Sequence, residues 1–200
     1  MKSSDFKNLT GWIDYDRDHL PTLTDKQKVA YFTKRLNMTL VKPLRHLYQG
    51  ISKGDKESAI LLYGTCTCCA IEALGKFHNG GIGKGNEPKF KSFLHAYMHA
   101  DFKNKRIDGT GYDRILWKFF RNGLAHGFAI SHGGYEHGSQ YFKTKINFGK
   151  KTLIIDPKHF HDDFLKAVSQ YIKDLKKARS SDPIFINFNK VFNDVFIRGN

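Results

Sequence analysis

The segment 56–77 is the most apolar part of this 200-residue chain and constrains the fold more than any other feature. Its small and apolar residues leave little polar face: Ile60, Leu61, Tyr63, Gly64, Cys68, Ile71, Leu74 and Gly75. A helix that is apolar on nearly all sides is buried among other elements. We therefore predict that this segment is the central helix of a helical bundle.

Further segments carry helical signals around this centre. Apolar residues recur at helical spacing in five of them: 25–47, 89–102, 112–128, 157–175 and 182–197. Thr24 and Gln27 can form a capping box at the first of these starts. Asp156-Pro157 and Asp182-Pro183 each place a capping residue before a Pro at the first helical position. Pro43 predicts a kink near residues 41–42, because Pro disrupts a helix interior.

Residues 140–155 alternate between apolar and polar side chains around Gly149-Lys150, which predicts a β-hairpin. The Gly-rich stretches 79–86 and 131–138 predict connections. The expected fold is therefore mainly all-α, an antiparallel bundle of five or six helices with a small appended β-hairpin. We expect one domain over residues 1–200, with its core at about 25–178 and a C-terminal helix at about 182–197.

The chain carries a formal net charge of +14. A positive field of this size attracts polyanions, so RNA, DNA and anionic membranes are candidate partners. A basic surface that only keeps the protein soluble is the alternative. The three cysteines lie within four residues of each other and predict a reducing compartment, not a disulfide framework. Without a secretory signal or an apolar run near the ~20 residues of a membrane span, we expect a cytoplasmic protein with no membrane partner.

The segment Arg121-Asn122-Gly123-Leu124-Ala125-His126 follows an aromatic helical run. Arg can bind a phosphate through two N–H groups, and His can transfer protons near neutral pH. Asn122 and His126 share one helix face, whereas Arg121 lies about 140° from His126 on an ideal helix. The two converge on one phosphate only if the helix loosens near Gly123 or a second subunit contributes. From spacing alone, a solvated pair or a buried hydrogen bond is the commoner role.

An Arg followed by a polar residue, with a His after four intervening residues, resembles the signature motif of the HEPN superfamily. The resemblance covers this motif and, loosely, the helical region from about 25 to 175. The segment 71–77, before the Gly-rich connection, also resembles helices of such proteins. The predicted hairpin is a departure, since a minimal HEPN bundle is helical, and an insertion would account for it.

The resemblance implies a metal-independent endoribonuclease that acts as a homodimer with a shared cleft. His126 would take the proton of the attacking 2′-hydroxyl or protonate the leaving 5′-oxygen. Arg121 would hold the scissile phosphate, and Asn122 would orient His126 or the phosphate. The products would be 2′,3′-cyclic phosphate and 5′-hydroxyl ends, with no metal or other cofactor, because RNA supplies its own nucleophile. A catalytically inactive helical module that binds RNA or a partner protein is the alternative.

Lys118, His132 and Tyr135 are the residues we expect to bind substrate beside the motif. His132 belongs to a loop of solvated histidines at the mouth of the cleft. Tyr135 can stack on a base, or pack in a turn. Such an enzyme would serve as a toxin or in phage defence, with an antitoxin or regulatory protein as a further partner.

Three other groupings have competing interpretations. The spacing of His126, His132 and His137 matches no tight zinc-ligand pair, so solvated histidines are favoured over a zinc site. The cysteines at 66, 68 and 69 lie within the apolar helix, where core packing is favoured over redox chemistry. The Gly-rich run 80–85 lacks the Ser or Thr that follows Lys in phosphate-binding loops, which favours a flexible connector.

Overall fold

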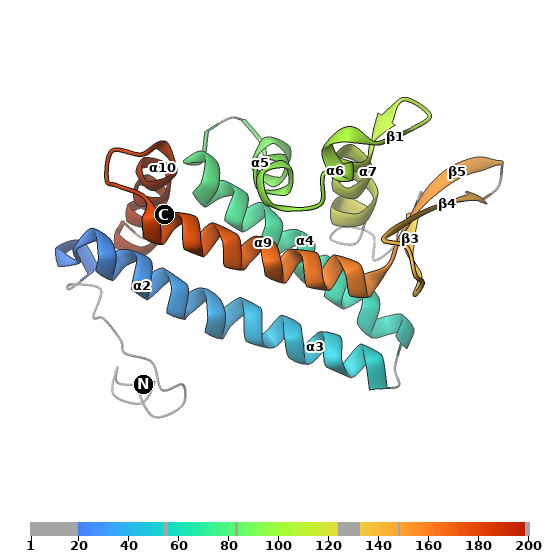
Figure 1. Ribbon diagram of the computed structural model, residues 1–200, viewed down its shortest axis with the longest axis horizontal. Coiled ribbons are helices and arrows are strands. Elements are labelled where there is room, and N and C mark those ends of the chain that lie inside the picture. The colour runs from blue at the N-terminus through green and yellow to red at the C-terminus, as the bar shows by residue number, and fades with distance from the viewer. Residues whose placement is uncertain (1–19, 54–55, 83, 124–132, 148, 199–200) are drawn as a thin grey trace.

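The computed structural model describes residues 20–53, 56–82, 84–123, 133–147 and 149–198, which are mainly helical, as predicted (Figure 1). The helical elements, of which η2, η3 and η4 are wider π-helical turns, are η1 (Leu20–Thr22), α2 (Asp25–Leu36), η2 (Asn37–Val41), α3 (Lys42–Lys53), α4 (Lys56–Asn79), α5 (Glu87–Tyr97), α6 (Asp101–Asn104), α7 (Tyr112–Ile115), η3 (Leu116–Arg121), α9 (Pro157–Lys177), α10 (Pro183–Phe192) and η4 (Asn193–Ile197). The strands are β1 (Arg106–Ile107), β2 (Thr110–Gly111), β3 (Gly133–Tyr135), β4 (Phe142–Asn147) and β5 (Lys150–Ile155).

The long helix α4 lies behind α9, and α2 continues into α3 along the front of the molecule (Figure 1). One side of α4 is buried in a core that is rich in aromatic rings from α5, α9 and α10. A stripe of α4 that includes Leu61, Leu62, Cys69 and Ala73 is nevertheless exposed. The prediction that nearly all sides of this helix are buried is therefore wrong for this stripe.

The part of α4 from Ala59 to Asn79 is long and apolar enough to cross a membrane, which differs from our expectation that no such run exists. Half of this window is buried inside the fold. The core helix of a soluble protein can be equally long and apolar, so length and composition do not distinguish a membrane span from a core helix.

The expected kink near Pro43 is replaced by the π-helical turn η2. The backbone N–H of Lys42 donates to the carbonyl of Asn37, five residues earlier. This wider turn accommodates a Pro, which has no N–H and whose ring clashes with the carbonyl four residues before it. As a result, α2, η2 and α3 form one continuous rod (Figure 1).

The predicted hairpin is confirmed: β4 and β5 pair antiparallel, with Asn147 opposite Lys150. The strand β3, in a stretch where we predicted only a connection, adds to the other edge of β5 in parallel. A second unpredicted pair, β1 with β2, lies between α6 and α7. It turns at Asp108-Gly109, both of which have positive φ. The helix predicted at 89–102 is divided into α5 and α6 at Met98, whose backbone is extended.

Candidate functional site

Arg121 lies at the end of η3, and its guanidinium faces the carboxylate of Glu72 on α4. Its Nε and one terminal nitrogen lie 2.7 Å and 2.6 Å from the same oxygen, Glu72 Oε2. Its other terminal nitrogen donates to the side-chain oxygen of Asn122 at 2.9 Å. The Arg121 and Glu72 side chains retain only 16% and 17% of their exposure. Solvent screens such a pair less than a surface ion pair, so it holds the guanidinium in one orientation.

The Arg121 guanidinium also lies over the ring of Trp117, 4.9 Å from its centre. Trp117 in turn packs against Phe90 of α5, with ring centres 5.3 Å apart. A cation over an indole ring is attracted by the negative face of the ring. The guanidinium is therefore fixed by contacts from α4, from η3 and, through Trp117, from α5.

The π-helical form of η3 places this arginine. The backbone N–H of Asn122 donates to the carbonyl of Trp117, five residues earlier, so the turn is wider than in an α-helix. Such bulges are frequent at functional sites. This wide turn ends at Arg121, so it does not test the predicted loosening of the helix near Gly123, between Arg121 and His126, and His126 lies outside the described residues.

Five N–H groups are present on a guanidinium. Three of them are engaged by Glu72 and Asn122 among the residues that the structure describes. The other two N–H groups, one on each terminal nitrogen, have no partner among the described residues and can donate to an anion such as a phosphate.

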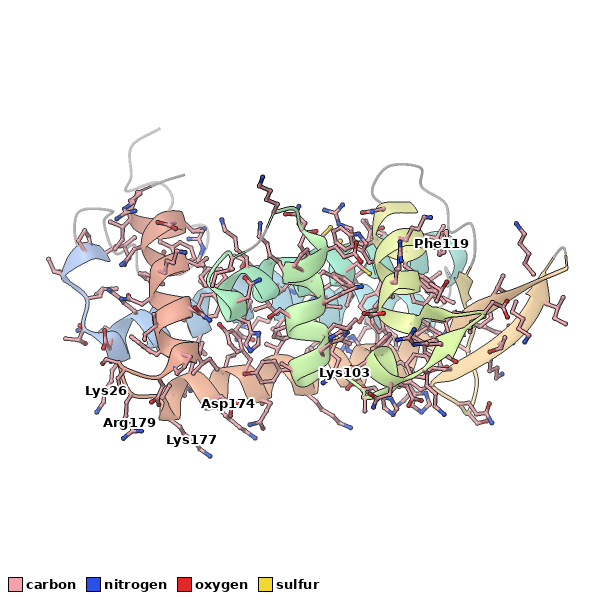
Figure 2. The ribbon with its side chains drawn as sticks, turned by 90° about the horizontal axis from the view of Figure 1, so that it is seen from above. Lys26, Lys103, Phe119, Asp174, Lys177 and Arg179 are labelled. Carbon is pink, nitrogen blue, oxygen red and sulfur yellow. The ribbon has the colours of Figure 1, made fainter. Side chains whose placement is uncertain are left out.

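Of the other residues predicted for the site, only Lys118 and Tyr135 are among the described residues. His126 and His132 lie outside the described residues. Lys118 is exposed, and its Nζ lies 5.3 Å from the ring centre of Phe119. Phe119 is on the side of the molecule opposite to Asp174 and Lys177 of α9 (Figure 2). Lys118 is therefore accessible on the same helical turn as Arg121.

Tyr135 is half-buried and packs against the core, as in the packing alternative above. Its ring contacts Phe120 edge-on at 5.2 Å and lies 6.2 Å from Phe160. Its hydroxyl lies against Gly64 of α4, where a Cβ atom would come within 2.5 Å of it. The buried hydroxyl has no hydrogen-bond partner among the described residues, and burial raises its pKa well above the usual value.

We expect Tyr135→Phe to raise the free energy of unfolding by about 1 kcal/mol, because it removes a buried hydroxyl without a partner. Tyr63→Phe is the matched control, since the Tyr63 hydroxyl contacts His161 Nδ1 at 2.9 Å. That change is expected to cost about 1 kcal/mol. Urea denaturation of both variants measures the difference, and equal losses would contradict the assigned environment of Tyr135.

The cysteines of α4 divide between core and surface. Cys68 is fully buried, and burial raises its pKa far above the usual value, while the nearby charge of Arg121 acts in the opposite direction. Burial also raises the pKa of Cys66. Cys69 is exposed, so the prediction of core packing holds for Cys68 and is wrong for Cys69. Redox sites require lowered thiol pKa values, opposite to the shifts of Cys66 and Cys68.

No group of three metal-ligating side chains is present in the described part of the chain. Two members of the histidine set considered above, at 126 and 132, are not among those residues. The third, His137, is exposed after β3.

Glu72 is the functional candidate that we did not predict from the sequence. It is the only acidic residue between Ala59 and Asn79 of the apolar helix, and this isolation is a signal that could have identified it. A carboxylate in such a helix needs a partner, because burying an unpaired charge is costly. The partner lies 49 residues away in the chain.

In comparisons with known proteins, no family model, curated protein or solved structure matches the chain.

Proposed function

We propose that this chain is a cytoplasmic, metal-independent endoribonuclease of the HEPN type that acts as a homodimer. The observation that carries the proposal is the oriented guanidinium of Arg121, held by Glu72, Asn122 and Trp117 with two N–H groups left for a phosphate. The charge of +14 supports a polyanionic substrate. A role as a toxin or in phage defence, controlled by an antitoxin or regulatory protein, would follow from such an activity.

In the proposed reaction, the 2′-hydroxyl oxygen attacks the adjacent phosphorus as His126 takes its proton. The bond from phosphorus to the 5′-oxygen breaks, and a protonated histidine returns a proton to this leaving oxygen. The products are a 2′,3′-cyclic phosphate and a 5′-hydroxyl. Arg121 stabilises the negative charge that grows on the phosphate oxygens, which is the role of a preorganised cation in phosphoryl chemistry. Lys118 would attract the adjacent backbone of the RNA.

The exposed stripe of α4 supports the homodimer. Leu62 retains 54% of its exposure, and Ala73 lies next to Glu72 in the chain. Beside the stripe is an apolar groove of about 500 Å³, bounded by α2, η2, α3, Phe196 and the α4 residues Cys66 and Cys69. A second copy that covered this surface would approach the Arg121 site, as the shared cleft implied by the HEPN resemblance requires.

The test is RNA cleavage in excess EDTA by the wild type, Arg121→Ala and His126→Ala. We expect wild-type cleavage with cyclic phosphate ends and a loss of at least about 10²-fold in each variant, since one stabilising group or one acid–base group contributes about 10²–10⁴. Arg114→Ala is the matched control, because Arg114 is an exposed arginine of α7, which leads directly into η3. An RNA with a single 2′-deoxy substitution at the cut position must remain intact.

The same measurement separates the enzyme from the inactive binding module. Intact RNA over a range of pH and salt would contradict the nuclease. If the wild type bound this RNA without cutting it, and Arg121→Ala bound it more weakly, the protein would be an RNA-binding module instead of a nuclease. Cleavage that persists in Arg121→Ala would show that this site is not the catalytic one.

A further inference from the structure

A groove on another face of the molecule lies between the rod of α2, η2 and α3 and the helix α9. Its volume is about 440 Å³. Its lining includes Val41, Leu165, Val168 and Ile172, which are buried or half-buried apolar residues. The rod and α9 run in opposite directions on the front face in Figure 1. The groove is therefore separate from the Arg121 site, which involves α4 and η3.

Each wall of the groove presents a regular row of residues at steps of three or four positions. One row comprises Ala30, Lys34, Asn37, Val41 and Arg45. The facing row on α9 comprises Leu165, Ser169, Ile172 and Lys176, and Val168 lies beside it. Two antiparallel ridges with this spacing form the kind of hydrophobic groove that receives an amphipathic helix. At 1.5 Å per residue the rows extend for about 16–22 Å, which matches three to four helical turns.

The rim of the groove is positive. Lys34, Arg45 and Lys176 are exposed, and none of them pairs with a carboxylate among the described residues. The groove lining contains no Asp or Glu. At one end of the groove, Lys26 and Lys177 lie close to Asp174 and to Arg179, which pairs with Asp182, so the positive character is carried mainly by Lys34, Arg45 and Lys176 along the rim (Figure 2). The Ser180 side chain donates to Asp25 at that end, which joins the start of α2 to the segment after α9.

We propose that this groove is the docking site for an acidic amphipathic helix of a partner protein. The apolar side chains of that helix would enter the groove, and its Asp and Glu residues would face the cationic rim. Charge complementarity of this kind governs partner choice and association rate, while the buried apolar contacts supply affinity. The proposal does not depend on the ribonuclease activity.

The apolar floor favours a protein helix over RNA as the occupant. RNA bound through its backbone requires charge along a groove, and bound bases require exposed aromatic faces. The lining residues include no aromatic ring. Aliphatic residues at helical spacing instead match apolar side chains at positions i, i+4 and i+7 of a bound helix.

The test uses a labelled synthetic helix of about 14 residues, roughly 21 Å long, with Leu on one face and Glu on the others. The controls are a peptide of the same composition without an apolar face, and a single-stranded RNA of equal charge. Fluorescence anisotropy near physiological salt measures binding to the full chain. We expect the ordered peptide to bind at least tenfold more tightly than the scrambled one.

Two groove variants locate the binding. Charge reversal by Lys34→Glu, Arg45→Glu and Lys176→Glu together is expected to weaken binding about tenfold or more, a loss that corresponds to about 1.4 kcal/mol. The uncharged change Ala30→Trp fills the groove and is expected to weaken binding similarly. The matched triple variant is Lys103→Glu, Lys105→Glu and Lys150→Glu, exposed lysines that lie outside the groove. It changes the net charge equally and is expected to alter binding less than threefold.

The proposal is supported if the ordered peptide binds and only the groove variants lose it. Equal binding of both peptides, or equal losses in the two triple variants, overturns it in favour of non-specific attraction. Loss of RNA binding in the groove variants, without peptide binding by the wild type, overturns it in favour of an RNA groove. Thermal denaturation of each surface variant confirms that it is folded.

Discussion

Gly75→Ala is expected to lower the free energy of unfolding by about 3 kcal/mol, as overpacking at a rigid contact does. A Cβ atom at Gly75 of α4 would lie 1.8 Å from the backbone carbonyl oxygen of Lys89 on α5, the shortest such approach among the described glycines. Backbone cannot move aside as a flexible side chain can. For a domain of this size, we expect a fall of about 6 to 12 °C in the melting temperature.

Gly50→Ala is the control for this prediction. Gly50 is also helical, in α3, but a Cβ atom added there would meet no other atom within 4 Å. Replacing a free helical Gly by Ala stabilises a helix by about 0.5–1 kcal/mol. Urea and thermal denaturation should therefore show a lower stability than the wild type for Gly75→Ala and a higher stability for Gly50→Ala. Equal stabilisation of both would contradict the close approach of α4 and α5.

The contact at Gly75 also concerns the candidate site. Phe90, next to Lys89 on α5, supports the Trp117 ring on which the Arg121 guanidinium lies. A shift of α5 away from α4 would move this support. We expect Gly75→Ala to reduce any activity of Arg121 even at temperatures where the variant is folded.

Local sequence signals were sufficient for the helix starts. The capping box of Thr24 and Gln27 is present, and the Asp156 side chain accepts from the backbone N–H of His159. Asp182 also precedes a helix that begins at Pro183, although its side chain accepts from the backbone N–H of Arg179 and caps no N–H of the helix. These features involve residues within four positions of each other, so they can be predicted without knowledge of the tertiary fold.

Features that depend on packing could not be predicted in this way. The strand β3 contains Gly133 and Gly134, which have low strand propensity, and it forms because β5 offers a free edge. A Cβ at Gly133 would lie 2.3 Å from the Phe120 ring, so the same glycine also permits contact with η3. The wide turns η2 and η3 likewise have no local signature beyond the Pro that follows the first.

The geometry of the candidate site could be predicted only in part. The sequence motif located Arg121 and Asn122, which do contact each other. It did not locate Glu72, because that contact depends on how α4 packs against η3. Tyr135 lies nearby in the chain, but its ring faces the core instead of an open cleft.

Glu72→Ala is expected to lower kcat/KM for RNA cleavage by about 10²-fold, since misplacing a catalytic group by about 1 Å costs this much. Glu72 is a positioning residue in this account, because it touches Arg121 and not the substrate. Glu72→Gln keeps an oxygen acceptor for the guanidinium, so it should recover about tenfold of the loss, mainly in kcat. Glu87→Ala, at a more exposed ion pair with Lys91, is the control and should leave cleavage unchanged.

The double variant Glu72→Leu with Arg121→Met separates catalysis from stability. Removing either partner alone leaves a half-buried charge without its counterion, which is expected to cost about 2 kcal/mol at this degree of exposure. Replacing both by apolar residues of similar size removes this penalty, so denaturation should show stability within about 1 kcal/mol of the wild type. Cleavage should remain absent, because no guanidinium is present. Recovery of cleavage together with stability would mean that the pair only supports the fold.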